Sequence, residues 1–140
     1  MTTREPNFLI AESWYVVALE LEYHVERLFG ARCRIVSPND LNSALLNEGP
    51  FACILCDTGP VMDLPADLLH AIQASKIPLV FTTSCDTFLT GVPGFETVPV
   101  LGKPYHVHDL VKMINMVMRA SSMPPDASSQ QAQQLEQDRF

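Results

Sequence analysis

The sequence has no long apolar run and few basic residues. No segment approaches the about 18 consecutive apolar residues that a membrane-spanning helix requires, and residues 1–6 lack the apolar stretch of a secretory signal peptide. Lysine and arginine number 9 against 16 aspartates and glutamates, which gives a formal net charge of −7. A nucleic-acid-binding domain usually shows a basic patch instead. These absences argue against a membrane protein and against direct binding of nucleic acid, and they predict a cytoplasmic protein.

Cysteine is scarce, with 4 in 140 residues, and it forms no complete metal motif. Cys53 and Cys56 have the spacing of a redox or zinc pair. They lie in a run that we interpret as a strand, where residues three apart point to opposite faces. The sequence holds no second such pair to complete a zinc site. We therefore expect two buried core cysteines rather than a reactive or metal-binding pair.

Short apolar runs alternate with segments of helical periodicity over most of the chain. Apolar residues make up 47% of the sequence, which is enough for the core of one domain of this length. The predicted strands are residues 8–11, 32–36, 51–56, 77–81 and 98–101. The predicted helices are residues 14–29, a segment from 37 that ends before Gly49, a segment that begins at 65, a weak segment at 85–89, and residues 106–118.

The alternation of strands and helices implies a parallel sheet with right-handed crossovers. Five such units predict an α/β fold, a flavodoxin-like doubly wound five-stranded parallel sheet of order 2-1-3-4-5 with about five helices. This domain is predicted to span residues 1–119. Residues 120–140 are rich in serine, glutamine and proline, so we expect a disordered or partly helical tail there.

The first predicted helix carries an apolar stripe and a stop signal. Its apolar side chains recur at spacings of three and four, which predicts that they pack on the sheet; they are Trp14, Val17, Leu21, Val25 and Leu28. Gly30 is expected to end the helix because glycine accepts the left-handed conformation at that position.

Polar residues follow four of the predicted strands. Glu12 follows the first strand, Asp57 the third, Thr83 the fourth and Lys103 the fifth. In an open α/β sheet the ligand binds outside the carboxyl ends of the strands, at the point where the strand order reverses. The sequence therefore predicts that two acids, a hydroxyl and a lysine meet in one crevice.

With these residues in register, the chain resembles the receiver domains of bacterial two-component signalling over about residues 8–118. The segment 8–13 is similar to the family's first strand with its acidic end. The segment 53–57 is similar to the strand that presents the phosphoacceptor, and 78–84 to the strand that ends in a switch hydroxyl. The segment 101–105 resembles the family's lysine-proline element.

The resemblance implies a role for each strand-end residue. It implies that Asp57 accepts a phosphoryl group, that Lys103 pairs with this group, and that Thr83 closes on it after transfer. It implies a Mg²⁺ ion held by Glu12, Asp57 and the backbone carbonyl of Gly59. The implied protein is a single-domain response regulator, not an enzyme, whose partners are a sensor histidine kinase or phosphotransfer protein and a target protein. A second copy of the chain, in a homodimer, is a further possible partner.

Two positions depart from the family's pattern. The family places two adjacent acids at the end of the first strand, whereas Ser13 follows Glu12 here. We therefore expect weak Mg²⁺ binding, because one negative charge is missing. Val100 stands where the family often has an aromatic switch residue, and the fourth helix is weak.

These departures favour an alternative interpretation, a degenerate pseudo-receiver that acts as a phosphorylation-independent interaction module. The retained Asp57, Thr83 and Lys103 oppose it. A third hypothesis is a small flavodoxin-like enzyme or nucleotide binder. It lacks the glycine-rich phosphate loop, because residues 11–14 contain no glycine.

Overall fold

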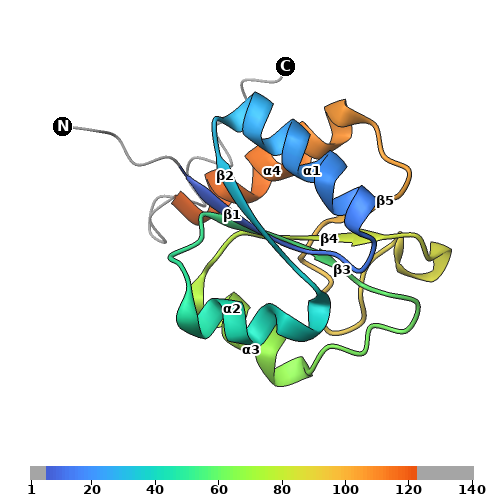
Figure 1. The fold of residues 1–140 in the computed structure, drawn as a ribbon. Helices are drawn as coiled ribbons and strands as arrows, with labels where there is room; N and C mark the ends of the chain where they lie inside the picture. The colour runs from blue at the N-terminus through green and yellow to red at the C-terminus, as the bar shows by residue number, and fades with distance from the viewer. Residues whose placement is uncertain (1–5, 123–140) are drawn as a thin grey trace, which may run out of the picture.

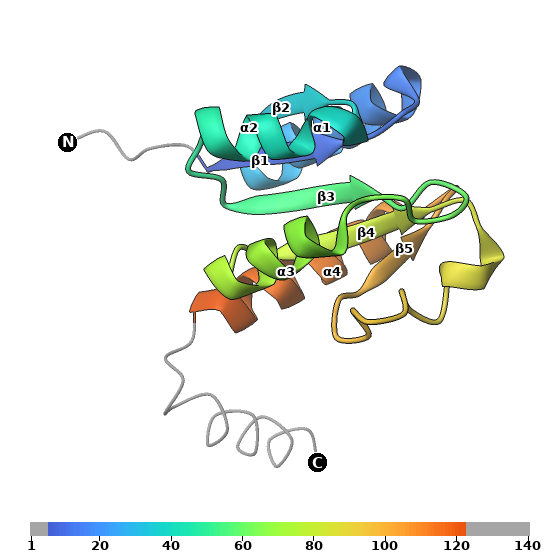
Figure 2. The same ribbon diagram turned by 90° about the horizontal axis from the view of Figure 1, so that it is seen from below.

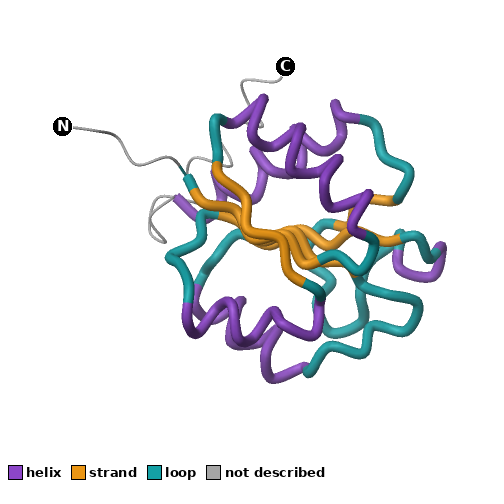
Figure 3. The backbone as a smooth tube through the Cα atoms, in the orientation of Figure 1, coloured by secondary structure: helices purple, strands orange, loops and turns teal. Residues whose placement is uncertain are grey.

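The computed structural model describes residues 6–122. They form a five-stranded parallel sheet of order β2-β1-β3-β4-β5 that is flanked by helices (Figures 1 and 3). The strands are β1 (Asn7–Ala11), β2 (Arg32–Val36), β3 (Cys53–Asp57), β4 (Leu79–Thr83) and β5 (Val100–Gly102). The helices are α1 (Tyr15–Phe29), α2 (Leu41–Asn47), α3 (Ala66–Ser75) and α4 (Val107–Ser122). Two 3₁₀ turns lie at Pro38–Asp40 and Asp86–Phe88. The predicted fold class and strand order are confirmed.

The helices cover both faces of the sheet. Helices α1 and α4 lie on one face and α2 and α3 on the other, as the two views at right angles show (Figures 1 and 2). Each face has its own apolar cluster. The α1/α4 face includes Phe8, Leu55 and Leu110, and the α2/α3 face includes Leu9, Ile54 and Phe81. All five residues of β3 and all five of β4 are buried, as expected for central parallel strands.

The weak helical segment predicted at 85–89 forms a short 3₁₀ turn, Asp86–Phe88, and not an α-helix. The described residues thus hold four α-helices and two 3₁₀ turns, close to the about five helices predicted. Gly91 and Gly94 follow with φ values of 133° and 85°, and Val92 forms an isolated bridge with Phe95. This glycine-rich turn leaves too few consecutive residues for a helix to propagate.

The structure corrects the predicted apolar stripe of α1. Trp14 lies before the helix in an extended conformation, and 72% of it is exposed. Leu28, in the last turn, is also largely exposed. The buried positions are Ala18, Leu21 and Val25, which share one face of the helix. Gly30 ends the helix in the left-handed conformation with φ 60°, as predicted.

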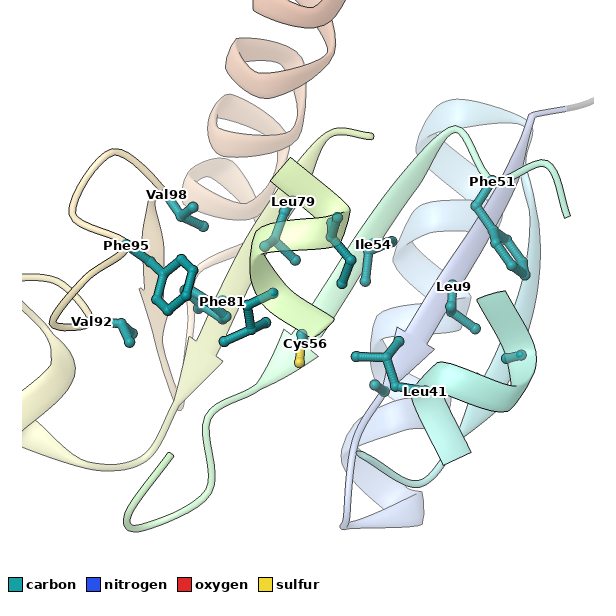
Figure 4. Close-up of a cluster of buried hydrophobic side chains, with 14 of the residues drawn as sticks. Leu9, Leu41, Phe51, Ile54, Cys56, Leu79, Phe81, Val92, Phe95 and Val98 are labelled. Carbon is teal, nitrogen blue, oxygen red and sulfur yellow. The ribbon is translucent and has the colours of Figure 1, made fainter. Parts of the chain in front are cut away.

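The two cysteines of β3 lie on opposite faces of the sheet, as predicted. Cys56 belongs to the α2/α3 cluster (Figure 4), Cys53 belongs to the α1/α4 cluster, and both thiols are free. The pKa of each thiol is raised from 9.0 to about 12, mainly by burial and, for Cys56, also by the nearby carboxylates of Asp57 and Glu12. Neither thiol is positioned to pair with the other.

Alkaline pH is therefore expected to destabilise the fold. The folded state favours the neutral thiols, so their contribution to stability is complete below about pH 9 and is lost as pH rises towards about 12. Each thiol lowers the free energy of unfolding by about 1.4 kcal/mol per pH unit in this window. Urea unfolding at about pH 8 and about pH 10 measures this loss. In Cys53→Ala the loss between the two pH values should shrink; an unchanged loss would contradict the assignment.

Two remaining expectations concern the ends of the chain and the membrane. The predicted tail at 120–140 lies mostly outside the described residues, and the described part extends α4 to Ser122, a few residues beyond the predicted end of that helix. Within residues 6–122, none of the helices combines the length and the apolar character that a transmembrane span demands.

Candidate functional site

Three predicted site residues leave the carboxyl ends of their strands on the same face of the sheet. Side chains alternate between faces along a strand. Ile10 and Leu55 contact the α1/α4 cluster, so Glu12 and Asp57, two residues further on, return to that side. Leu101 belongs to the same cluster and places Lys103 there too. The alternation therefore brings two acids and one lysine from three strands to one point.

Lys103 joins the two carboxylates. Its Nζ donates to Glu12 Oε1 at 2.6 Å and to Asp57 Oδ1 at 3.0 Å. The strand end itself is fixed, because the Lys103 backbone N–H donates to the Thr83 carbonyl at 2.7 Å. Hydrogen bonds between an ammonium and a carboxylate are among the stronger ones in proteins. The ammonium therefore serves as the shared counter-ion of both acids.

The cluster is buried and carries a net negative charge. The exposed fractions of the side chains are 1% for Glu12, 7% for Asp57 and 8% for Lys103. Two carboxylates and one ammonium sum to −1. Buried charges are tolerated when they are paired and hydrogen-bonded, and the remaining negative charge suits a cationic ligand.

Two backbone N–H groups and one hydroxyl also donate hydrogen bonds to the carboxylates. The Gly59 N–H donates to Asp57 Oδ1 at 3.2 Å, and the Trp14 N–H donates to Glu12 Oε2 at 3.1 Å. Asp57 Oδ2 accepts only from the Ser13 hydroxyl, at 3.4 Å, among the described residues. Oδ1 is thus held by two donors, while Oδ2 is the less engaged oxygen of Asp57.

Ser13, which follows Glu12, acts as a weak donor. Its contact with Asp57 Oδ2 is at the long end of hydrogen-bond distances. The two acids of the cluster, Glu12 and Asp57, meet at the Lys103 ammonium. In the described part of the chain, no three histidine, cysteine or acidic residues gather at one point.

The two carboxylates of this site could hold a Mg²⁺ ion. Magnesium prefers oxygen ligands and is commonly held through one or two carboxylates plus waters. Asp57 Oδ2 could ligate such an ion, and Glu12 would supply a second carboxylate. The Gly59 carbonyl accepts from the Thr58 hydroxyl at 2.8 Å, and its second lone pair could serve a metal.

Thr83 contacts other partners than the charged cluster. Its hydroxyl lies 2.8 Å from the Thr58 hydroxyl and accepts from the Cys85 N–H at 3.0 Å. Both threonines are buried, with exposed fractions of 0% and 1%. The structure thus brings Glu12, Asp57 and Lys103 into direct contact, and it holds the Thr83 hydroxyl in a separate hydrogen-bonded pair.

Thr58 is a residue that the sequence analysis missed. The alternation of side chains along the strands could have found it. Thr58 lies two positions after Cys56, and Thr83 lies two positions after Phe81, so both threonines return to the α2/α3 face. The Thr58 backbone N–H donates to the Thr82 carbonyl at 2.9 Å. This bond fixes Thr58 beside the end of β4 and places its hydroxyl against Thr83.

No protein-family model and no curated protein matches the sequence. Solved structures do match the fold. The REC domain of the PhyR response regulator from Erythrobacter litoralis has 22% sequence identity, with 86% of this chain and 95% of the other covered and a TM-score of 0.66.

Two further structures show the same similarity. The receiver domain of a two-component response regulator from Bacteroides fragilis has 20% identity, 86% and 100% coverage and a TM-score of 0.63. The signal receiver domain of an HD domain-containing protein from Pseudomonas fluorescens has 15% identity, 84% and 98% coverage and a TM-score of 0.67. At such low identities the similarity concerns architecture. Together with the strand order and the four strand-end residues, it shows that this chain has the fold of response-regulator receiver domains.

Proposed function

We propose that the chain is a signalling switch that accepts a phosphoryl group on Asp57 and acts through protein contacts, without turning over a substrate of its own. The donor is a sensor histidine kinase or a phosphotransfer protein, and the phosphorylated form binds a target protein. The observation that supports this most strongly is the Lys103 ammonium, which lies between the carboxylates of Glu12 and Asp57 at the ends of three strands.

Asp57 Oδ2 is the proposed nucleophile. Oδ1 is held by Lys103 and Gly59, whereas Oδ2 has only the long contact with Ser13. Oδ2 forms a bond to phosphorus as the phosphorus–nitrogen bond of a phosphohistidine breaks, and the electron pair of that bond stays on the imidazole nitrogen. The Lys103 ammonium offsets the charge of the transferred group. Phosphoryl transfer depends mainly on such positioning and charge neutralisation.

A divalent cation is part of the proposal. When bound, Mg²⁺ supplies positive charge to the oxygens of the transferring group. Glu12 and Asp57 are the residues that would hold it, with the Gly59 carbonyl as a further ligand. Because Ser13 replaces an acid, we propose that the ion is held weakly.

Incubation with a small phosphodonor such as phosphoramidate and Mg²⁺ is expected to add the mass of one phosphoryl group to the intact protein. The reason is that Asp57 is the one carboxylate of the site with a weakly engaged oxygen. Intact-mass spectrometry measures the addition. Asp57→Asn should abolish it, because the amide is a poor nucleophile, while Glu48→Gln, which changes an exposed surface acid, should leave it in place.

The outcomes separate the proposal from its alternative. Labelling that persists in Asp57→Asn would contradict Asp57 as the acceptor. An unlabelled wild-type protein at high Mg²⁺ would favour a receiver fold that works as a phosphorylation-independent interaction module.

A further inference from the structure

The hydroxyls of Thr58 and Thr83 form a buried pair beside the proposed phosphoacceptor. The two oxygens are 2.8 Å apart, and both residues are almost completely buried. Thr58 directly follows Asp57, and Thr83 ends β4, which pairs with β3 through Asp57 and Thr82. The pair therefore connects the acceptor strand with Thr83, the residue that the resemblance to receiver domains expects to close on the phosphoryl group.

A count of hydroxyl protons gives the direction of these bonds. Thr58 Oγ1 lies 2.8 Å from the Gly59 carbonyl and 2.8 Å from Thr83 Oγ1, yet it has one proton. One proton cannot serve both contacts; we assign it to the Gly59 carbonyl, so that Thr83 donates to Thr58 and both short contacts are hydrogen bonds. Thr83 Oγ1 also accepts from the Cys85 N–H at 3.0 Å. The Cys85 carbonyl, the other oxygen to which the Thr83 hydroxyl can donate, is more distant, at 3.5 Å. The bonds thus run from the Cys85 N–H through Thr83 and Thr58 to the Gly59 carbonyl.

The position of the pair opposes contact between Thr83 and a group on Asp57. Among the described residues, Asp57 accepts hydrogen bonds from Lys103, Gly59 and Ser13 and not from Thr83. Thr83 has a single hydroxyl proton, and the assignment above directs it to Thr58. Donation to a phosphoryl oxygen therefore requires that the bond to Thr58 break first.

We infer that Thr58 is a positioning residue that holds Thr83 in its unphosphorylated arrangement. This inference rests on the proposed function. Removing the Thr58 hydroxyl weakens the arrangement in which Thr83 donates to Thr58 and leaves unchanged the arrangement in which Thr83 donates to a phosphoryl group. A ligand that favours the second arrangement then binds more tightly, because less of its binding energy is used to displace Thr83.

Beryllofluoride, an inorganic mimic of a carboxylate-bound phosphoryl group, serves as the probe. Titration into the 140-residue chain with Mg²⁺ present, followed by the fluorescence of its single tryptophan, gives a dissociation constant. Thr58→Val, which replaces the hydroxyl with a methyl group of similar size, should lower this constant by about three- to tenfold, the range expected for one net hydrogen bond. Thr58→Ser keeps the hydroxyl and should retain the wild-type value.

A double-mutant cycle distinguishes this role from a general effect on packing. In a Thr83→Val background, Thr58→Val should have no further effect on the dissociation constant, because the bond it removes is already absent. Equal dissociation constants for wild type and Thr58→Val would overturn the inference. It would also be overturned if Thr58→Val lowered the dissociation constant by the same factor in the wild-type and Thr83→Val backgrounds. If Thr58→Val does not fold, judged by its thermal melt, Thr58→Ala replaces it with the same expected direction.

The failure of the inference differs from the failure of the proposed function. A wild-type protein that takes a phosphoryl group and binds beryllofluoride, with Thr58→Val unchanged, contradicts only the role of Thr58. A wild-type protein that does neither contradicts the proposed function and, with it, the inference.

Discussion

Lys103→Met is expected to lower the free energy of unfolding by about 3 kcal/mol or more. The Lys103 side chain is 8% exposed and is the shared counter-ion of Glu12 and Asp57, whose own side chains are 1% and 7% exposed. Methionine fills a similar volume but leaves two buried carboxylates without a cation, and an uncompensated buried charge is strongly destabilising. Urea unfolding at neutral pH measures the loss.

A surface ion pair offers the matched control. Arg34 donates to Glu48 at 2.7 Å, but the two side chains are 52% and 40% exposed. Pairs of this kind contribute about 1 kcal/mol or less, so Arg34→Met should cost much less than Lys103→Met. In a Glu12→Gln background the cost of Lys103→Met should also fall, because one of the two carboxylates is then neutral. Equal losses for Lys103→Met and Arg34→Met would contradict the buried-cluster account.

Ser13→Asp is expected to tighten Mg²⁺ binding by at least about tenfold. One added unit charge at about 4 Å interacts by about 4 kcal/mol at an effective dielectric constant of about 20, before desolvation is subtracted. Ser13 Oγ lies 3.4 Å from Asp57 Oδ2, so a carboxylate at this position faces the same point as Asp57. The difference should be largest at low ionic strength, where screening is weakest.

Trp14 supplies the signal for this titration. It is the single tryptophan of the chain, it is exposed, and its backbone N–H contacts Glu12. Without metal, Ser13→Asp should be less stable than wild type, because three carboxylates then crowd around one ammonium; Mg²⁺ should restore the loss by linkage. Equal Mg²⁺ affinities for the two proteins would contradict the placement of Ser13 beside the metal.

The sequence was sufficient to predict the topology and the meeting of the charged residues. Alternating apolar runs and helical segments specify the parallel sheet, and in such a sheet the strand ends share one edge. Glu12, Asp57 and Lys103 could therefore be placed together from the sequence alone, and in the structure Lys103 contacts the two acids at 2.6 Å and 3.0 Å.

The remaining features depend on side-chain packing across elements, which residue spacing does not encode. Trp14 fits the helical spacing by number, but the helix begins one residue later, so its ring is exposed. A lysine before a proline is usually solvated, yet the fold buries Lys103 between two acids. The partner of the Thr83 hydroxyl depends on the side-chain geometry of Thr58, a residue on a different strand end.

The central claim, that Asp57 is the phosphoacceptor, is tested most directly by locating the acyl phosphate. Borohydride reduces an aspartyl phosphate to homoserine and releases phosphate, so it converts a labile modification into a stable mark on the residue that carried it. After treatment with phosphoramidate and Mg²⁺, reduction and proteolysis, peptide mass spectrometry should find homoserine at position 57 and no conversion of Glu12, whose carboxylate is held by Lys103 and the Trp14 N–H. Reduction at any other acid, or none in a protein shown to be folded and exposed to Mg²⁺, would contradict the account.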